Sequence, residues 1–155
     1  MLANFVQGYI EKYGVPKEVK KIAEYCRERE NGKVFRNETE NTIQTIIFYH
    51  IAKNTIIVEK DKKDNVKGVL MWYNCNYDDG WDFICNWEED KPEGDTILLA
   101  FFFADNIKYI KRGIKKLLKQ EPAVLTKKLT GYRLKHFNPK KVDFPNRLFD
   151  KFLKL

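Results

Sequence analysis

The stretch "TILLAFFFADNIKYIKRGIKKLLKQ", residues 96–120, decides the fold. Its first part, residues 96–104, is an apolar run with no polar alternation, which is typical of a β-strand covered on both faces. The remainder places isoleucines and leucines on one stripe and cationic residues on the opposite arc, as in an amphipathic helix. A buried strand followed directly by such a helix predicts a strand–helix–strand unit. We therefore expect a strand over residues 123–128, parallel to the strand at residues 96–104.

Apolar spacing and turn residues predict the other elements. Helices are expected at residues 2–12, 17–30 and 40–52. Two strands at 55–59 and 66–73 are expected to form a hairpin, and a short strand is expected at 82–87. A last strand is expected at 132–137, after a turn at "LTG", residues 129–131. This order predicts an α+β fold, with a mixed β-sheet and helices on both faces. We expect one domain over residues 1–155, with a helical part (1–53), a sheet core (54–138) and a basic amphipathic tail (139–155).

Composition argues against several classes of protein. No stretch approaches the length of a transmembrane helix, and the N-terminus lacks a basic start followed by an apolar run, so we expect a cytoplasmic protein without membrane contact. Cys26, Cys75 and Cys85 form no C-x-x-C motif and only two histidines accompany them, so no metal site is predicted. We interpret the cysteines as reduced thiols.

Charge is distributed unevenly along the chain. Residues 1–100 carry 14 Lys and Arg against 18 Asp and Glu, whereas residues 101–155 carry 15 against 4. Such a basic end concentrates polyanions, so the expected partners are DNA, RNA or an acidic protein surface, and the alternative is a solvated lysine-rich face. The candidate contact residues are Lys115, Lys116, Lys119, Lys127, Lys128, Arg133, Lys135, Lys140 and Lys141, with Tyr132, His136 and Phe137 interleaved.

The C-terminal stretch "FPNRLFDKFLKL", Phe144 to Leu155, has the spacing of a short amphipathic helix. Its apolar side can fold back on the core, which is the default, or dock into a partner and support a protein assembly.

The order of helices, hairpin, buried strand, helix and further strands resembles the GNAT superfamily of acyl-CoA N-acyltransferases. The resemblance covers roughly residues 55–137. It is carried by "NTIIVEKDKKDNVKGVLMWY", which is similar to the family's paired strands with a V-x-G at Val66 to Gly68, by "ILLAFFFADN" as the central strand, and by "RGIKKLL" as the start of the cofactor helix. The chain looks most like short, divergent members from bacteriophage genomes. This similarity implies a phage protein, either free in the cytoplasm or incorporated in a virion.

In that family the central strand bulges and splays from the next strand, its backbone pairs with the pantetheine arm of CoA, and N–H groups of the following helix hold the pyrophosphate. The resemblance implies acetyl-CoA as a cofactor at Phe103, Ala104, Lys108, Arg112 and Gly113. The chain departs from the family's loop motif, Gln/Arg-x-x-Gly-x-Gly/Ala. With Gly113 as the first glycine, Ile110 and Lys115 occupy the other defining positions. The family's usual general-acid tyrosine also has no equivalent helix here, and Tyr132 is not a safe substitute.

Asp105 and Asn106 are the candidates to cap the basic helix. A capping aspartate would occupy the N–H groups that a pyrophosphate needs and would place negative charge there, which disfavours CoA. Gly113 would then lie inside the helix and permit close packing against a neighbour. The acidic segment, residues 76–95, offers Asp78, Asp79, Asp82, Glu88 and Glu89 as a general base or as an attraction for a cationic amine, and the alternative is a solvated loop.

From these observations we expect a GNAT-like, non-catalytic protein without a cofactor, which acts by binding or assembly through its basic C-terminal face. The alternative is an active N-acetyltransferase that uses acetyl-CoA and modifies an amine. The sequence identifies no catalytic residue.

Overall fold

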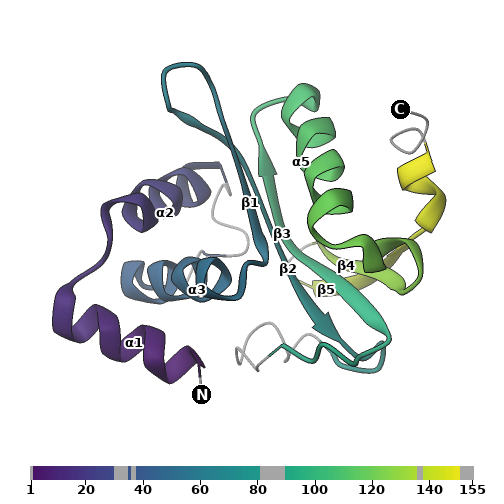
Figure 1. The fold of residues 1–155 in the computed structure, drawn as a ribbon, viewed down its shortest axis with the longest axis horizontal. Helices are drawn as coiled ribbons and strands as arrows, with labels where there is room; N and C mark the ends of the chain where they lie inside the picture. The colour runs from purple at the N-terminus through teal and green to yellow at the C-terminus, as the bar shows by residue number, and fades with distance from the viewer. Residues whose placement is uncertain (1, 30–34, 36–37, 81–89, 136–137, 151–155) are drawn as a thin grey trace.

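The structure, a computed structural model, describes residues 2–29, 35, 38–80, 90–135 and 138–150. Its centre is a five-stranded sheet in the order β1-β2-β3-β4-β5 (Figure 1). The strands are β1 (Ile56–Lys60), β2 (Val66–Cys75), β3 (Thr96–Ala104), β4 (Lys128–Lys135) and β5 (Asn138–Phe144). Only β3 and β4 are parallel, and the other neighbours are antiparallel. The predicted α+β fold with a mixed sheet is confirmed.

Helices cover both faces of the sheet, as predicted (Figure 1). One face carries α2 (Lys17–Arg29) and α3 (Glu40–Lys53), with α1 (Leu2–Tyr13) outside α3, and the other face carries α5 (Ile107–Gln120). The three N-terminal helices each end within one residue of the boundaries expected from the sequence. Their apolar spacing and the break at Pro16 were therefore sufficient to place them.

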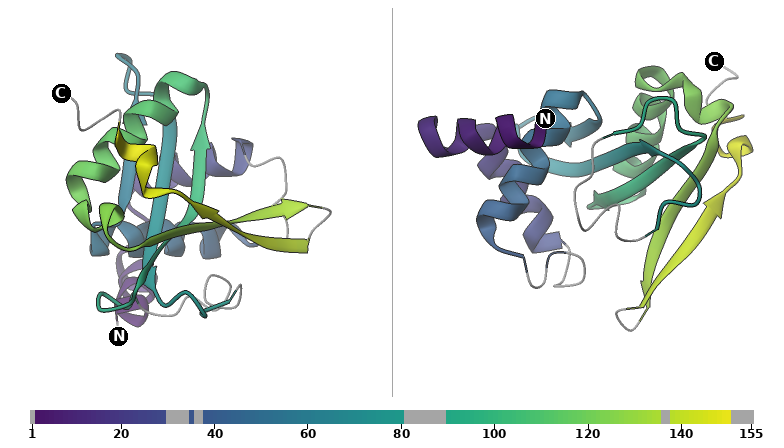
Figure 2. Two further views of the ribbon diagram at one scale, coloured as in Figure 1. Left: turned by 90° about the vertical axis from the view of Figure 1, so that its right-hand side faces the viewer. Right: turned by 90° about the horizontal axis from the view of Figure 1, so that it is seen from below.

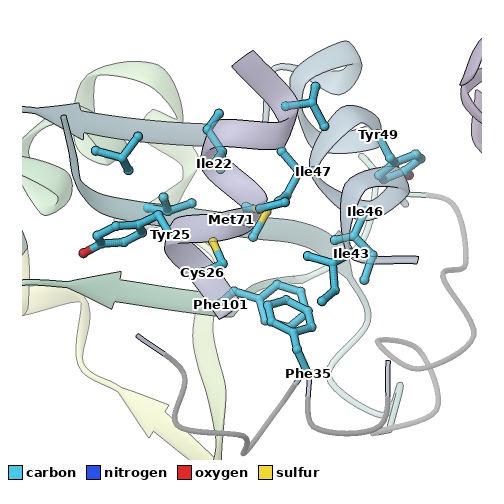
Figure 3. Close-up of a cluster of buried hydrophobic side chains, with 14 of the residues drawn as sticks. Ile22, Tyr25, Cys26, Phe35, Ile43, Ile46, Ile47, Tyr49, Met71 and Phe101 are labelled. Carbon is cyan, nitrogen blue, oxygen red and sulfur yellow. The ribbon is translucent and has the colours of Figure 1, made fainter. Parts of the chain in front are cut away.

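The core beneath α2 and α3 is the larger of the two apolar clusters formed by the described residues, and Figure 3 shows many of its side chains. The rings of Phe35 and Phe101 stack with centroids 5.1 Å apart, while Met71 and Ile47 are fully buried beside them. Burying such side chains is the main favourable term in folding.

A second cluster lies between the sheet and α5. Leu117 of α5 and Trp72 of β2 are buried there together with Val124 and Phe149, which follow the helix in the chain. Val124 belongs to the 3-10 helix η1 (Pro122–Leu125) and Phe149 to the 3-10 helix η2 (Asn146–Phe149). Phe149 is fully buried, so the described part of the C-terminal stretch folds back on the core, which was the expected default.

The expected strand at residues 123–128 is wrong. This segment begins as η1, because Pro122 starts the 3-10 turn and lacks the N–H that a ladder needs, and the parallel partner of β3 begins at Lys128. The expected turn at "LTG" is also wrong, since these residues lie inside β4. Residues 138–144 form the edge strand β5 and belong to the sheet, so the expected tail begins only after Phe144. The expected strand at 82–87 lies outside the described residues.

Candidate ligand cleft between strands β3 and β4

Strands β3 and β4 separate halfway along their length. They pair from Thr96 with Lys128 to Leu99 with Gly131, and no pairing between them follows. Beyond this point β3 stays paired with β2 as far as Ala104, while β4 stays paired with β5 (Figure 2). The edge of β3 that faces β4 therefore has no strand partner among the described residues after Leu99. Its backbone N–H and C=O groups are able to pair with another extended chain.

A β-bulge in β3 lies where the two strands separate. Met71 of β2 pairs with Phe101, but Trp72 pairs with Leu99, so Ala100 is an extra residue in β3. A bulge of this kind bends its strand and increases the local twist. It turns the second half of β3 away from β4.

An open cleft of about 330 Å³ occupies the space between the separated strands. This volume is within the range of small-ligand sites. The cleft is lined by Leu99, Ala100, Phe101, Phe102, Phe103, Gly131, Tyr132, Val142 and Phe144. Phe102 and Phe144 are each 36% exposed, so part of each side chain remains accessible. The lining is thus apolar with an open backbone edge, which suits an extended chain that carries both methylene and amide groups.

Gly131 is the residue that allows this arrangement at the point where the strands separate. A Cβ there would lie 3.3 Å from the Leu99 carbonyl oxygen and 3.0 Å from the Phe144 ring, so these neighbours would have to shift by a few tenths of an ångström. A glycine inside a strand is a known sequence signal for such close approach, and it is the one signal that could have revealed this part of the cleft.

Tyr132 is the only titratable side chain among the described residues that line the cleft. Its hydroxyl donates to the carbonyl oxygen of Asp79 at 3.4 Å, and burial raises its pKa, so it keeps its proton at neutral pH. The sequence did not predict a functional role for Tyr132, because no helix separates it from the parallel strand. In the structure Tyr132 follows Gly131, the last residue of β4 that pairs with β3, and it therefore lines the cleft.

The N-terminus of α5 is capped by Asn106, whose side-chain oxygen accepts the N–H of Lys108 at 3.0 Å. The expectation that an aspartate caps this helix and repels a pyrophosphate is therefore wrong. The Asp105 carboxylate instead accepts hydrogen bonds from Arg29 at 2.6 Å and from the Tyr25 hydroxyl at 2.9 Å, and lies 3.3 Å from Lys67 Nζ. These groups from α2 and β2 draw it away from the helix.

The ion pair of Asp105 makes stability depend on pH. The Arg29 guanidinium lowers the pKa of Asp105 to about 2. Because the pKa is below its usual value in the folded protein, the stabilisation is present above about pH 4 and is lost as the pH falls towards 2. A fifth of the Asp105 side chain is exposed, so solvent screens the ion pair in part. We therefore expect Asp105→Asn to lower the free energy of unfolding by about 1 kcal/mol at neutral pH, less than the full pKa shift would imply. Urea unfolding of both proteins at several pH values measures this, and a difference that stays constant down to pH 2 would contradict the assignment.

The candidate cofactor residues lie at the end of β3 and on the first half of α5. Phe103 lines the cleft and Ala104 ends β3 opposite Gly68. Gly113 is buried inside α5, so its expected position within the helix is confirmed. A Cβ there would lie 3.4 Å from the Phe102 ring, an ordinary contact distance, so an alanine would also fit. The cations of Lys108 and Arg112 are exposed and lie 5.4 and 5.8 Å from the centroid of the Tyr109 ring. Arg112 is therefore exposed on the outer side of the helix, whereas Gly113 faces the sheet.

The candidate basic residues fall into separate groups. On α5, Lys116 pairs with Glu59 at 2.7 Å, while Lys115 and Lys119 form no ion pair with a described carboxylate. Lys140 is exposed on β5, and the side chains of Arg133 and Lys135 on β4 lie outside the described residues, as do His136 and Phe137.

The remaining three lysines contact the acidic segment and not solvent alone. Lys127 donates to the Pro92 carbonyl at 2.8 Å, and the cations of Lys128 and Lys141 each lie 4.2 Å from the centroid of the Tyr77 ring. Lys128 and Lys141 share the sheet face of Tyr132, which packs against the α2 and α3 cluster, whereas α5 lies on the opposite face. The basic end is thus not one continuous surface.

Three described carboxylates of the acidic segment, those of Asp79, Asp90 and Asp95, have partners within the protein. Asp79 pairs with Lys91 at 3.1 Å, and Asp90, with 4% of its side chain exposed, accepts from the Asn74 amide at 3.0 Å. Asp78 is exposed, and Asp82, Glu88 and Glu89 lie outside the described residues. None of the described carboxylates lines the cleft.

The described residues contain no cluster of His, Cys, Asp and Glu that could hold a metal ion. Cys26 and Cys75 are buried, and burial raises the pKa of both thiols, while Cys85 lies outside the described residues. His50 is fully buried with Nδ1 2.8 Å from the Thr55 hydroxyl, and burial lowers its pKa to about 3. Within the described part of the chain, no helix has the length and apolar character to cross a membrane.

The fold and cleft define a class of architecture, an α+β protein whose bulged central strand and parallel neighbour enclose an apolar cleft. No protein-family model matches the chain, and no curated protein matches it.

Proposed function

We propose that the cleft between β3 and β4 binds the pantetheine arm and acyl group of an acyl-CoA, as the resemblance to the GNAT superfamily implies. The observation that carries this proposal is the separation of β3 from β4 at a bulge, which leaves an open backbone edge beside an apolar cleft. Pantetheine is an extended chain with two amides, so it matches an edge that offers N–H and C=O groups and walls that cover methylenes.

The fit covers the pantetheine arm and not the diphosphate. Asn106 already engages the Lys108 N–H at the start of α5, and Gly113 is buried inside the helix. Because the cap is an asparagine and not an aspartate, it brings no negative charge that would repel CoA. It still occupies the Lys108 N–H, which is therefore not free for a phosphate. Phosphate groups therefore contribute less to affinity here than a helix N-terminus can supply.

We propose binding without catalysis as the main function. The described lining offers Tyr132 but no histidine or carboxylate that could accept a proton from an amine. The second candidate is N-acyl transfer, which the presence of the protonated Tyr132 in the lining favours. Its hydroxyl would exchange the long hydrogen bond to the Asp79 carbonyl for one to the departing thiolate, to which it would give its proton, and would regain a proton from the attacking amine. A bound acyl-CoA supplies a thioester, which a neutral amine can attack once it is positioned.

Calorimetric titration with acetyl-CoA tests the binding. We expect one site, and we expect Val142→Trp to weaken affinity at least about tenfold because the indole fills the cleft. Lys140→Trp is the matched control, since it adds the same side chain two residues away on an exposed position of β5. Absence of heat with the wild-type protein, or equal weakening by both variants, would contradict the proposal. Release of free thiol in the presence of a set of amines distinguishes transfer from binding alone.

A further inference from the structure

We propose that the outer face of α5 binds the phosphate backbone of nucleic acid without sequence preference, independently of the cleft. The helix contains six cationic residues and no aspartate or glutamate. It forms the outer layer on its side of the sheet, opposite α1, α2 and α3 (Figure 1). The cations are Lys108, Lys111, Arg112, Lys115, Lys116 and Lys119.

The cations of α5 repel one another along the helix. Lys111, Lys115 and Lys119 follow each other at intervals of four residues, and Lys108, Arg112 and Lys116 form a second such row. Like charges at this spacing destabilise a helix, and surface helices usually relieve them with interleaved glutamates. Here only Lys116 pairs with a described carboxylate, that of Glu59 on β1. A polyanion that lies along the helix would remove the repulsion.

The two rows have the geometry of a backbone contact. Four residues of a helix advance about 6 Å, so Lys111 and Lys119 lie about 12 Å apart along the axis. Lys108, Lys111, Arg112 and Lys119 are exposed and Lys115 is half-buried, so five cations are available on one elongated face. Several phosphates of one strand can be contacted at once, and neutralising phosphates releases counterions.

Other anionic partners fit this face less well. An acidic protein would need apolar anchors among the charges, but the buried stripe of Tyr109, Gly113 and Leu117 faces the protein's own core, and Ile107 is the one large apolar side chain exposed on the described helix. The same burial prevents insertion into a membrane surface. Lys119 lies about 12 Å beyond Lys111 along the helix axis, so the row of cations extends well past the start of α5.

Fluorescence anisotropy with a labelled duplex DNA of arbitrary sequence tests the proposal. The triple variant Lys111→Gln, Lys115→Gln, Lys119→Gln should bind about tenfold or more weakly, and the slope of log affinity against log salt between about 50 and 200 mM should fall by about 3. The control Lys12→Gln, Lys17→Gln, Lys20→Gln makes the same change in net charge at exposed positions of α1 and α2 and should bind as the wild type does. Val142→Trp should also bind normally, which separates this site from the cleft.

Three results would overturn the proposal. Equal losses in the two triple variants would show an effect of net charge alone, and unchanged binding by the α5 variant would place the contact elsewhere. Polyglutamate that displaces the duplex at equal charge concentration would assign the face to acidic polypeptides. Circular dichroism checks that the variants remain folded, which we expect because removing like charges favours the helix.

Discussion

Gly94→Ala is expected to lower the free energy of unfolding by about 3 kcal/mol or more, the upper end of the cost of overpacking. A Cβ at this position would lie 2.1 Å from the carbonyl oxygen of Cys75 and 3.0 Å from that of Lys91. Both are backbone atoms, so no flexible side chain can yield. The turn before β3 would have to move away from the end of β2, and chemical denaturation measures the cost.

Gly8→Ala is the matched control for this prediction. Gly8 lies in α1 and a Cβ there would contact nothing within 4 Å, so the same substitution should stabilise the protein by up to about 1 kcal/mol through helix propensity. If Gly94→Ala cost less than about 1 kcal/mol, the close approach of the turn to β2 would be contradicted.

Phe149→Ala is expected to cost about 3 kcal/mol, the usual loss for removing a fully buried aromatic side chain. Phe149 closes the cluster between α5 and the sheet, beside Leu117 and Val124. Chemical denaturation of this variant shows whether the C-terminal stretch is packed on the core or is available to a partner.

Phe5→Ala provides the comparison, because Phe5 is 63% exposed on α1. Its loss should change the free energy of unfolding by no more than about 0.5 kcal/mol. Similar small effects for both substitutions would indicate that Phe149 is not buried in solution.

The elements that the sequence predicted well are those with strong periodicity. The apolar run at β3, the stripe of α5 and the N-terminal helices are all present at nearly the expected residues. The region after α5 was predicted wrongly because Gly131 resembles a turn residue. In the structure it lies inside β4, where a Cβ would crowd Leu99 and Phe144. Local patterns do not record which distant backbone will approach a glycine.

The cleft was only partly predictable for the same reason. Phe103 was expected from the central strand, but Val142 and Phe144 enter through the register of β5, which no local pattern specifies. The choice between Asp105 and Asn106 as helix cap was equally indirect. Both residues cap helices well, and Arg29 and Lys67 decide the outcome from distant segments.

Hydrogen exchange of β3 with and without acetyl-CoA tests the central claim most directly. Some amides between Ala100 and Ala104 face the cleft and lack a strand partner, so they should exchange quickly in the free protein and slowly in the complex. Amides of α2 should not change. If saturating acetyl-CoA leaves exchange in β3 unchanged, or protects only residues away from the cleft, the cleft is not the site of binding.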